Sequence, residues 1–544
     1  MEQFLATETL IIELLLIVSL VAIVVRRLKV PYTVALVIVG LLITFQQSVV
    51  IDLTPELILA LFVPPLVFEA AFHIDFSRLR DNLTPILVLA VPGVLLTTLI
   101  VGGIVAAGVR VPLTTALVFG ALISATDPVA VVALFRTLGA PRKLAVLVEG
   151  ESLFNDGTAI VVFNLMLTAA AAAVVNGESQ ALNGFDLGRA IIDFVVVSLG
   201  GVAVGGLLGW LIARLIARLD DYLIETTLTT VLAFGAYLIA ERLHFSGVLA
   251  VVAAGLVNGN LGPRGMSPTT RIVLFNFWEY LAFVANSLVF LLIGLQVNIP
   301  QIVTHIGPIV VAVVAVLVSR GVVVYGLTWL INRRTRSVST VYQHVQFWGG
   351  LRGAISLALA LSLPASLVDR ELLKIMAFGV VLFTLVGQGT TMQFLLKKLG
   401  LAQHTAETLE FDRRHGRLMA ARAARQRLDQ LHRDGSISDP TWEQLVREMD
   451  DHVQGHLEQQ RELLNQYPAL RAEELEDTRR EGLRTQRATL AALQRDGVIS
   501  ERAYEELVSE VDAALDEPAA LDEPAAPAAL NAAVDGAPPA GGVV

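Results

Sequence analysis

Thirteen apolar segments, each roughly as long as a membrane span, follow one another before residue 400. They cover residues 9–25, 31–46, 53–72, 84–108, 113–135, 143–173, 188–216, 223–241, 245–258, 274–297, 303–331, 341–363 and 372–396. Inside a bilayer, such segments satisfy their backbone hydrogen bonds as α-helices. The sequence therefore predicts an all-α polytopic membrane protein with 13 transmembrane helices.

The connections between these segments differ in their content of basic residues. Alternate connections hold 17 Lys and Arg, whereas the opposite ones hold only Arg110, Arg189, Arg242 and Arg370, with Lys374 near an edge. By the positive-inside rule, the basic side is cytoplasmic. We therefore expect a multi-pass protein of the plasma membrane (the inner membrane of a bacterium), with the N-terminus outside. The first segment is expected to be a retained span, because the N-terminus lacks the basic region of a signal peptide.

The chain changes character at about residue 401. From there on, 16 Lys and Arg stand against 28 Asp and Glu, and no apolar run reaches membrane length. We expect a transmembrane domain at 1–400, a cytoplasmic helical tail at 401–513 and a disordered Ala/Pro-rich C-terminus at 514–544. The net charge of −10 therefore belongs to the tail, since the first 400 residues carry a net charge of +2.

The tail contains a two-copy repeat. LDQLHRDGSISDPTWEQLVREMD, which begins at Leu428, matches LAALQRDGVISERAYEELVSEVD, which begins 62 residues later. Gly435 and Gly497 suit helix C-caps, and Ser438 and Ser500 suit the N-caps that follow. Each copy is therefore predicted to form a helical hairpin, either as a pairing surface or as a solvated tail without a ligand.

The fifth apolar segment contains an acidic residue directly before a proline. Asp127 lies 14 residues after Leu113, which is about 21 Å along a helix and near the middle of a bilayer. Pro128 has no backbone N–H and disfavours helical geometry at Asp127. The pattern predicts a broken helix, in which the carbonyl of Thr126 faces a cavity and half-helix N-termini stabilise the Asp127 carboxylate.

The sixth segment carries three carboxylates in the stretch EGESLFNDGT, at residues 149–158. Each ionised group at such a depth costs about 2.5–3.5 kcal/mol on insertion scales, so an intramembrane carboxylate is a candidate functional group. Asp156 lies at the same depth as Asp127. Ser152 and Asp156 share one helix face with Glu149 one turn earlier, while Glu151 and Asn155 share the adjacent face.

Two arginines late in the chain are the candidate partners of these carboxylates. Arg320 lies in the eleventh segment, and Arg352 lies in the twelfth among Gly349, Gly350 and Gly353. These glycines make a second helix break plausible, and Arg352 would compensate half-helix C-terminal dipoles. Breaks in the fifth and twelfth segments fall at corresponding positions of segments 4–6 and 11–13. They predict inverted repeats with crossed broken helices, as in secondary transporters.

Other polar groups within the segments have weaker functional implications. Glu69 and Glu279 lie deep, and structural pairing and a place on an ion pathway are equally open for each. The run of glycines from Gly200 to Gly209 is interpreted as close helix packing, since it lacks the strand and lysine of a nucleotide-binding loop. The chain has no cysteine. No cofactor, nucleic-acid partner or enzymatic activity is expected.

Four motifs resemble one known family. ATDPVAVVALF, EGESLFNDGTAIVVF, LTWLINRR and FWGGLRGAISLALAL resemble signatures of the monovalent cation:proton antiporter-1 family, of the NhaP and sodium/hydrogen exchanger type. The likeness covers residues 10–400 and leaves out the tail. It implies an NhaA-like antiporter fold in a homodimer, with core spans at about 84–173 and 303–396 and dimerisation spans at about 9–72 and 188–297.

The resemblance also implies a role for each motif residue. Asp156 would bind Na⁺ and H⁺ alternately, with Ser152 and the main-chain oxygen of Thr126 as further Na⁺ ligands and Glu151 nearby. Asn155 would mark electroneutral exchange. Glu151 and Arg320 would form a buried ion pair, and Asp127 and Arg352 would compensate the helix dipoles at the crossing. Glu149 resembles the bacterial form of the motif.

The expected function is exchange of Na⁺, or of Li⁺, for H⁺ in pH homeostasis. A lone carboxylate that binds either ion leaves the site equally charged in both loaded states, and a bare charge opposes movement through a dry barrier. A K⁺/H⁺ antiporter on the same fold is the nearest alternative, since cavity size separates these ions. An intramembrane aspartyl protease using Asp127 and Asp156, or a channel, is a distant one, and the protease gives Arg320 and Arg352 no role.

Overall fold

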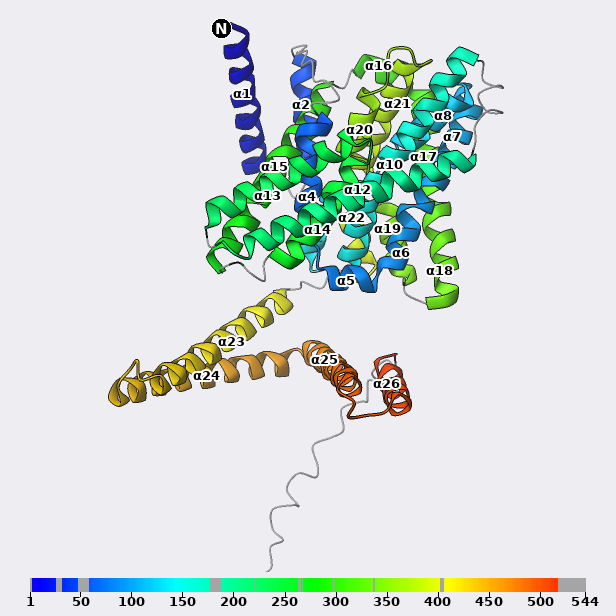
Figure 1. Ribbon diagram of the computed structural model, residues 1–544. Coiled ribbons are helices and arrows are strands. Elements are labelled where there is room, and N and C mark those ends of the chain that lie inside the picture. Colours follow the sequence, from blue (N-terminus) through cyan, green and yellow to red (C-terminus); the bar gives the residue numbers. More distant parts are fainter. Residues whose placement is uncertain are drawn as a thin grey trace, which may run out of the picture. The chain divides into compact units, whose positions relative to one another are not determined.

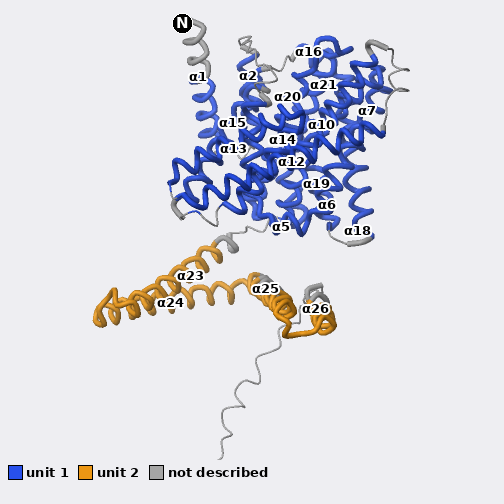
Figure 2. Tube along the Cα trace, viewed as in Figure 1, with its two compact units in different colours: residues 1–403 blue, residues 404–544 orange. Residues whose placement is uncertain are grey.

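The computed structural model describes residues 2–25, 32–46, 58–176, 187–219, 221–262, 266, 268–296, 299–335, 338–401 and 406–516. Every regular element in these ranges is a helix. The chain forms two compact units, residues 1–403 and residues 404–544 (Figure 2). The disordered C-terminus was predicted at residues 514–544, but residues 514–516 belong to the last helix, which ends at Asp516. The remainder of that stretch, from residue 517, lies outside the described residues.

The first unit contains the apolar segments. Its α-helices are α1 (Glu2–Val25), α2 (Tyr32–Gln46), α4 (Val63–His73), α5 (Phe76–Asp81), α6 (Leu83–Ala90), α7 (Pro92–Val109), α8 (Leu113–Leu122), α9 (Val129–Leu138), α10 (Arg142–Asn176), α12 (Leu187–Ile216), α13 (Tyr222–Arg242), α14 (Gly247–Leu261), α15 (Pro268–Gln296), α16 (Ile299–Thr304), α17 (Ile306–Gly321), α18 (Thr328–Thr335), α19 (Thr340–Trp348), α20 (Ala354–Leu361), α21 (Arg370–Phe383) and α22 (Gly389–Lys398) (Figure 1). Three π-helical turns lie between them: η1 (Ile58–Phe62), η3 (Val322–Leu327) and η4 (Thr384–Gln388).

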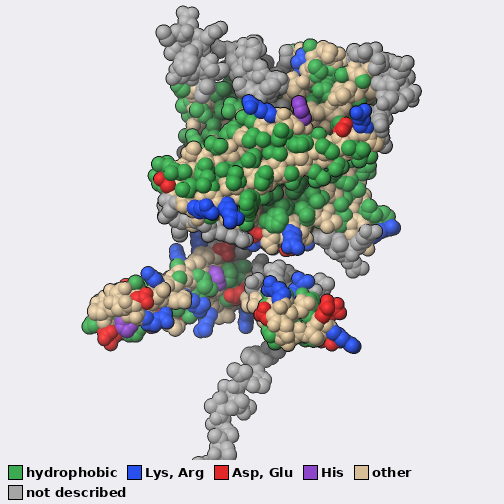
Figure 3. All heavy atoms as spheres, in the orientation of Figure 1, with side chains coloured by type: hydrophobic (Ala, Val, Ile, Leu, Met, Phe, Trp, Pro, Cys, Tyr) green, Lys and Arg blue, Asp and Glu red, His purple; other side chains and the backbone are tan. Residues whose placement is uncertain are grey.

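Each of the thirteen predicted segments contains helix in this structure. Among the described residues, seven helices are long and apolar enough to cross a membrane, and six more apolar helices are shorter. On the face shown in Figure 3, hydrophobic side chains cover much of the middle of the first unit. An all-helical protein with many membrane spans follows from these observations, while the number 13 stays a prediction.

Both predicted helix breaks are confirmed. The fifth segment divides into α8 and α9, with residues 123–128 between them. The twelfth divides into α19 and α20, with residues 349–353 between them. The breaks contain Pro128 and the cluster of glycines, as the local chemistry predicts.

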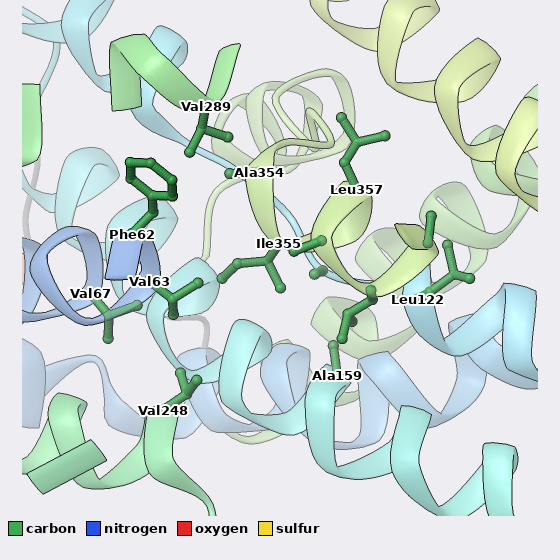
Figure 4. Close-up of a cluster of buried hydrophobic side chains, with 14 of the residues drawn as sticks. Phe62, Val63, Val67, Leu122, Ala159, Val248, Val289, Ala354, Ile355 and Leu357 are labelled. Carbon is green, nitrogen blue, oxygen red and sulfur yellow. The ribbon is translucent and has the colours of Figure 1, made fainter. Parts of the chain in front are cut away.

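Apolar side chains surround the region where the breaks lie. Figure 4 shows Ile355 of α20 among Leu122 of α8, Ala159 of α10 and Val63 of α4. All four are at most 9% exposed. Where the breaks pack against these apolar side chains, their polar groups must find partners within the protein.

Helix α12 packs closely on α14 through its glycines, as predicted. A Cβ atom added at Gly209 would lie 2.9 Å from the carbonyl oxygen of Ala254, and one added at Gly205 would collide with the carbonyl of Ala250. By contrast, a Cβ atom at Gly206 would meet nothing within 4 Å. The small residues therefore let the two backbones approach on one face of α12.

In its described part, residues 406–516, the second unit forms four helices, and the second pair repeats the start positions of the first. They are α23 (Ala406–Arg433), α24 (Asp439–Gln466), α25 (Pro468–Arg495) and α26 (Glu501–Asp516). Helices α23 and α25 have the same length at an offset of 62 residues, and α24 and α26 start at that offset. The predicted pair of helical hairpins is confirmed.

The ends of these helices match the predicted caps. Gly435 and Gly497 have φ angles of 69° and 72°, the left-handed region that glycine adopts at helix ends. Ser500 accepts a hydrogen bond from the N–H of Ala503 at 3.3 Å. Ser438 differs, because its hydroxyl contacts the Thr441 hydroxyl at 3.0 Å instead of a backbone N–H.

Candidate functional site

The two broken helices meet at their breaks. The backbone N–H of Asp127 donates to the carbonyl oxygen of Leu351 at 2.8 Å. The Asp127 carboxylate accepts the N–H of Val129 at 3.0 Å and also that of Ala354. These are the first residues of α9 and α20. One carboxylate therefore lies at the positive N-terminal ends of two half-helices, the arrangement that dipoles favour.

Arg352 lies at the C-terminal end of α8, where the helix dipole is negative. Its side chain is 1% exposed, and Nη1 donates to the carbonyls of Ser124 at 2.8 Å and Ala125 at 3.2 Å. The Ser356 hydroxyl, one turn later on α20, donates to the same Ala125 carbonyl at 3.2 Å. Carbonyls freed at the end of α8 are thus satisfied by a cation and a hydroxyl from the other broken helix.

The third freed carbonyl, that of Thr126, faces α10. It accepts the Ser152 hydroxyl, and Asn155 Nδ2 lies 3.3 Å from the Thr126 hydroxyl. Asp156 is one turn after Ser152 on α10, and its carboxylate has no hydrogen-bond partner among the described residues. Ser152, Asn155 and Thr126 are at most 6% exposed. The structure therefore brings three of the predicted oxygen donors, Asp156, Ser152 and Thr126, to one place.

Glu151 faces away from this group of oxygens. It forms an ion pair with Arg320 Nη1, and the two residues are 2% and 7% exposed. Arg320 also donates to the carbonyl of Gln346 from Nε at 3.2 Å and from Nη2 at 2.9 Å. The ion pair is thus held between α10, α17 and α19, which come from both halves of the chain.

A cavity of about 760 Å³ reaches the candidate ion site. Its walls include the oxygen donors Thr126 and Ser152 and five acidic side chains, at Glu69, Asp127, Glu149, Asp156 and Glu279. No Lys or Arg is among the described residues that line it, and neither Glu151 nor Asn155 lines it. Such a lining raises the local concentration of cations. Of the residues predicted to bind the ion, Asp156, Ser152 and Thr126 line the cavity. Glu151 pairs instead with Arg320, and Asn155 contacts the Thr126 hydroxyl without lining the cavity.

Three contacts at the crossing were not predicted from the sequence. Ser356 follows Arg352 by four residues, the spacing of one helical turn, and this spacing could have indicated it. The Thr384 hydroxyl accepts the backbone N–H of Arg352 at 3.1 Å, and the Gln346 carbonyl binds Arg320. No local sequence pattern indicates the contacts of Thr384 and Gln346, because each contact joins two separate segments of the chain.

Comparison with known proteins agrees with this architecture. The family model described as "Sodium/hydrogen exchanger, transmembrane" matches residues 14–398. The Na(+)/H(+) antiporter ApNhaP of Aphanothece halophytica is 40% identical over 480 residues, which cover 87% of this chain and 89% of that protein. The Na(+)/H(+) antiporter NhaP of Pseudomonas aeruginosa is 38% identical over 64% of this chain and 82% of its own.

A solved structure shows the same fold. The sodium proton antiporter MjNhaP1 from Methanocaldococcus jannaschii superposes with a TM-score of 0.62 at 22% identity, over 74% of this chain and all of that one. The chain belongs to the sodium/hydrogen exchanger family.

Proposed function

We propose that this chain exchanges Na⁺ for H⁺ across a membrane, with Asp156 as the group that carries either ion. The chain is a transporter of the sodium/hydrogen exchanger family rather than an enzyme, and relatives 35–40% identical over most of the chain are named Na(+)/H(+) antiporters. One observation supports the site above all. The Asp156 carboxylate, which has no hydrogen-bond partner among the described residues, lines an acidic cavity together with Ser152 and Thr126, next to the crossing of the two broken helices.

The chemistry of exchange follows from the cost of a buried charge. A proton or a Na⁺ neutralises Asp156, while the bare carboxylate would enter a dry barrier without a partner. Movement of the site is therefore favourable when it is loaded and opposed when it is empty. Ser152 and the Thr126 carbonyl complete the oxygen ligands for Na⁺, whose binding requires the hydrogen bond between them to open.

Fixed charges around the site have structural roles in this proposal. Asp127 and Arg352 hold the ends of the broken helices, and each is engaged by backbone groups. Glu151 and Arg320 neutralise each other. Asn155 is neutral. Among the residues of the crossing and the ion site, Asp156 alone then changes its charge in the cycle, which predicts electroneutral exchange of one Na⁺ for one H⁺.

The proposed membrane arrangement is the one predicted from the sequence, with 13 spans, inverted repeats, the N-terminus outside and the tail in the cytoplasm. The cavity includes Thr137 near the end of α9 and Tyr32 at the start of α2. In the sequence, Arg136 lies next to Thr137 and Lys29 precedes Tyr32, on the side assigned to the cytoplasm. In the proposed orientation, the cavity therefore lies toward the cytoplasmic side, which favours an inward-facing conformation. The homodimer that the resemblance implies would use α12 as a contact surface, since only 11% of the most apolar part of this helix is buried; lipid would cover the same surface in a monomer.

Everted membrane vesicles with a pH-sensitive dye test the function. We expect Na⁺ to collapse the pH gradient in vesicles with the full chain, and we expect Asp156→Asn to abolish this response. Persistence of the Na⁺ response in Asp156→Asn would refute the proposed site. Repeating the assay with Li⁺ and K⁺ identifies the cations transported, and a response to K⁺ alone would assign the K⁺/H⁺ alternative.

A further inference from the structure

Hydrogen bonds to two other segments of the chain hold the break between α19 and α20. On one side, the Leu351 carbonyl accepts the N–H of Asp127 at 2.8 Å. On the other, the next residue, Arg352, donates its N–H to the Thr384 hydroxyl at 3.1 Å. A backbone N–H in a helix break has lost its partner within the helix, so a buried break needs a contact of this kind.

Thr384 is suited to this contact. It is 1% exposed, and its hydroxyl donates to the carbonyl of Val381 at 3.0 Å, which leaves the oxygen lone pairs for Arg352. Thr384 begins the π-helical turn η4 inside the segment α21–α22. Such turns displace a side chain from its regular helical direction and are frequent at functional sites. Thr384 does not line the cavity, so it does not touch the ion.

A chain of contacts leads from Thr384 to the oxygens of the ion site. The hydroxyl fixes the backbone of Arg352, whose guanidinium holds the carbonyls of Ser124 and Ala125. The next carbonyl along the chain, that of Thr126, is the proposed Na⁺ ligand beside Ser152. A shift of Arg352 therefore displaces the peptide groups that set the direction of the Thr126 carbonyl.

We propose that Thr384 is a positioning residue for cation binding, through the backbone N–H of Arg352. The proposal rests on the ion site described under Proposed function. Without the hydroxyl, the Arg352 N–H is buried and unsatisfied, and the break relaxes toward another partner. The oxygens of the ion site then lose their preset geometry, so Na⁺ binding weakens while the exchanging carboxylate remains.

The test compares three variants of the full chain in everted vesicles. Thr384→Val removes the hydroxyl at nearly constant volume, and Thr384→Ser keeps it. Thr328→Val is the matched control, because Thr328 is also fully buried but its hydroxyl bonds only to carbonyls of its own helical segment, those of Val324 and Tyr325. We expect Thr384→Val to raise the apparent KM for Na⁺ about tenfold, the effect of one lost buried hydrogen bond, with Vmax within about twofold of the parent.

Thr384→Ser and Thr328→Val are expected to stay within about twofold of the parent in both constants. The proposal is overturned if Thr384→Val behaves like Thr328→Val, or if Thr384→Ser does not restore the KM. If Thr384→Val does not reach the membrane, Thr384→Cys replaces it with the same expected rise, because a thiol is a weak acceptor.

A second measurement separates this proposal from the ion site itself. Hydrogen exchange of peptides that contain residues 349–353 should be faster in Thr384→Val than in the parent and unchanged in Thr384→Ser. If Asp156→Asn still transports Na⁺, the proposed ion site is wrong. The hydrogen-exchange rate of the Arg352 amide would even then show whether Thr384 holds this part of the backbone. Equal rates in all variants would overturn the positioning role.

Discussion

The buried pair of Glu151 and Arg320 allows a sharp prediction. Arg320→Met leaves the Glu151 carboxylate, 2% exposed, without its partner. Loss of one member of a buried ion pair costs about 3–5 kcal/mol of folding free energy. The Gln346 carbonyl also loses both donor atoms of Arg320, which adds about 1–3 kcal/mol. Arg320→Met should therefore destabilise the first unit by at least about 3 kcal/mol.

The double variant Glu151→Leu/Arg320→Met separates the two contributions. It removes both charges, and apolar residues of similar volume are close to neutral at buried ion pairs. Only the unsatisfied Gln346 carbonyl remains, so we expect a loss of about 1–3 kcal/mol. The double variant should therefore melt at a higher temperature than Arg320→Met.

Thermal unfolding of the purified full chain in detergent, followed by tryptophan fluorescence, measures these differences. Arg333→Met is the matched control, because Arg333 is exposed and stacks on Trp329 with 3.7 Å between its guanidinium carbon and the ring centroid. An exposed cation–π contact contributes about 0.5–1 kcal/mol. The reasoning is refuted if Arg320→Met melts like Arg333→Met, or if the double variant melts below the single one.

Two further predictions concern packing and the tail. Gly205→Ala should lower the melting temperature, with a cost of about 1–3 kcal/mol, because the added Cβ meets the Ala250 carbonyl. Gly206→Ala is the control and should leave the melting temperature unchanged, because the space around Gly206 is open. Equal effects of the two substitutions would contradict the packing described. In the tail, the hydrogen bond and charge of Arg425 lower the pKa of Asp429. The stabilisation is therefore present above the unfolded-state pKa and is lost as the pH falls through the folded-state pKa. Hydrogen exchange of the α23–α24 peptides, corrected for intrinsic rates, should show a larger loss in the parent than in Arg425→Ala, in which the Trp442 indole still donates to Asp429.

The sequence predicted what local chemistry decides. An acidic residue before proline at mid-segment and a cluster of glycines located both helix breaks to within a few residues, because these residues change the backbone directly. The repeat in the tail predicted the starts of α24 and α26 in the same way. The position of Asp156 followed from helical spacing alone.

Contacts across the fold could not be predicted in this way. Arg352 was expected to compensate helix dipoles, but nothing local indicated that it would bind the carbonyls of Ser124 and Ala125, more than 200 residues earlier in the chain. The pairing of Glu151 with Arg320 came from family resemblance and not from spacing. No sequence pattern pointed to Thr384, because its proposed role depends on a π-helical turn and on the packing of that turn against a break in another segment.

The dependence of Na⁺ affinity on pH tests the central claim most directly. If Na⁺ and H⁺ compete for Asp156, the apparent KM for Na⁺ rises as the pH falls, approaching about tenfold per pH unit on the acid side, while the extrapolated Vmax stays constant. The measurement uses reconstituted full chain with the same pH on both faces of the membrane at the start of each assay. A KM that does not change with pH, or a pH effect confined to Vmax, would contradict a shared carboxylate.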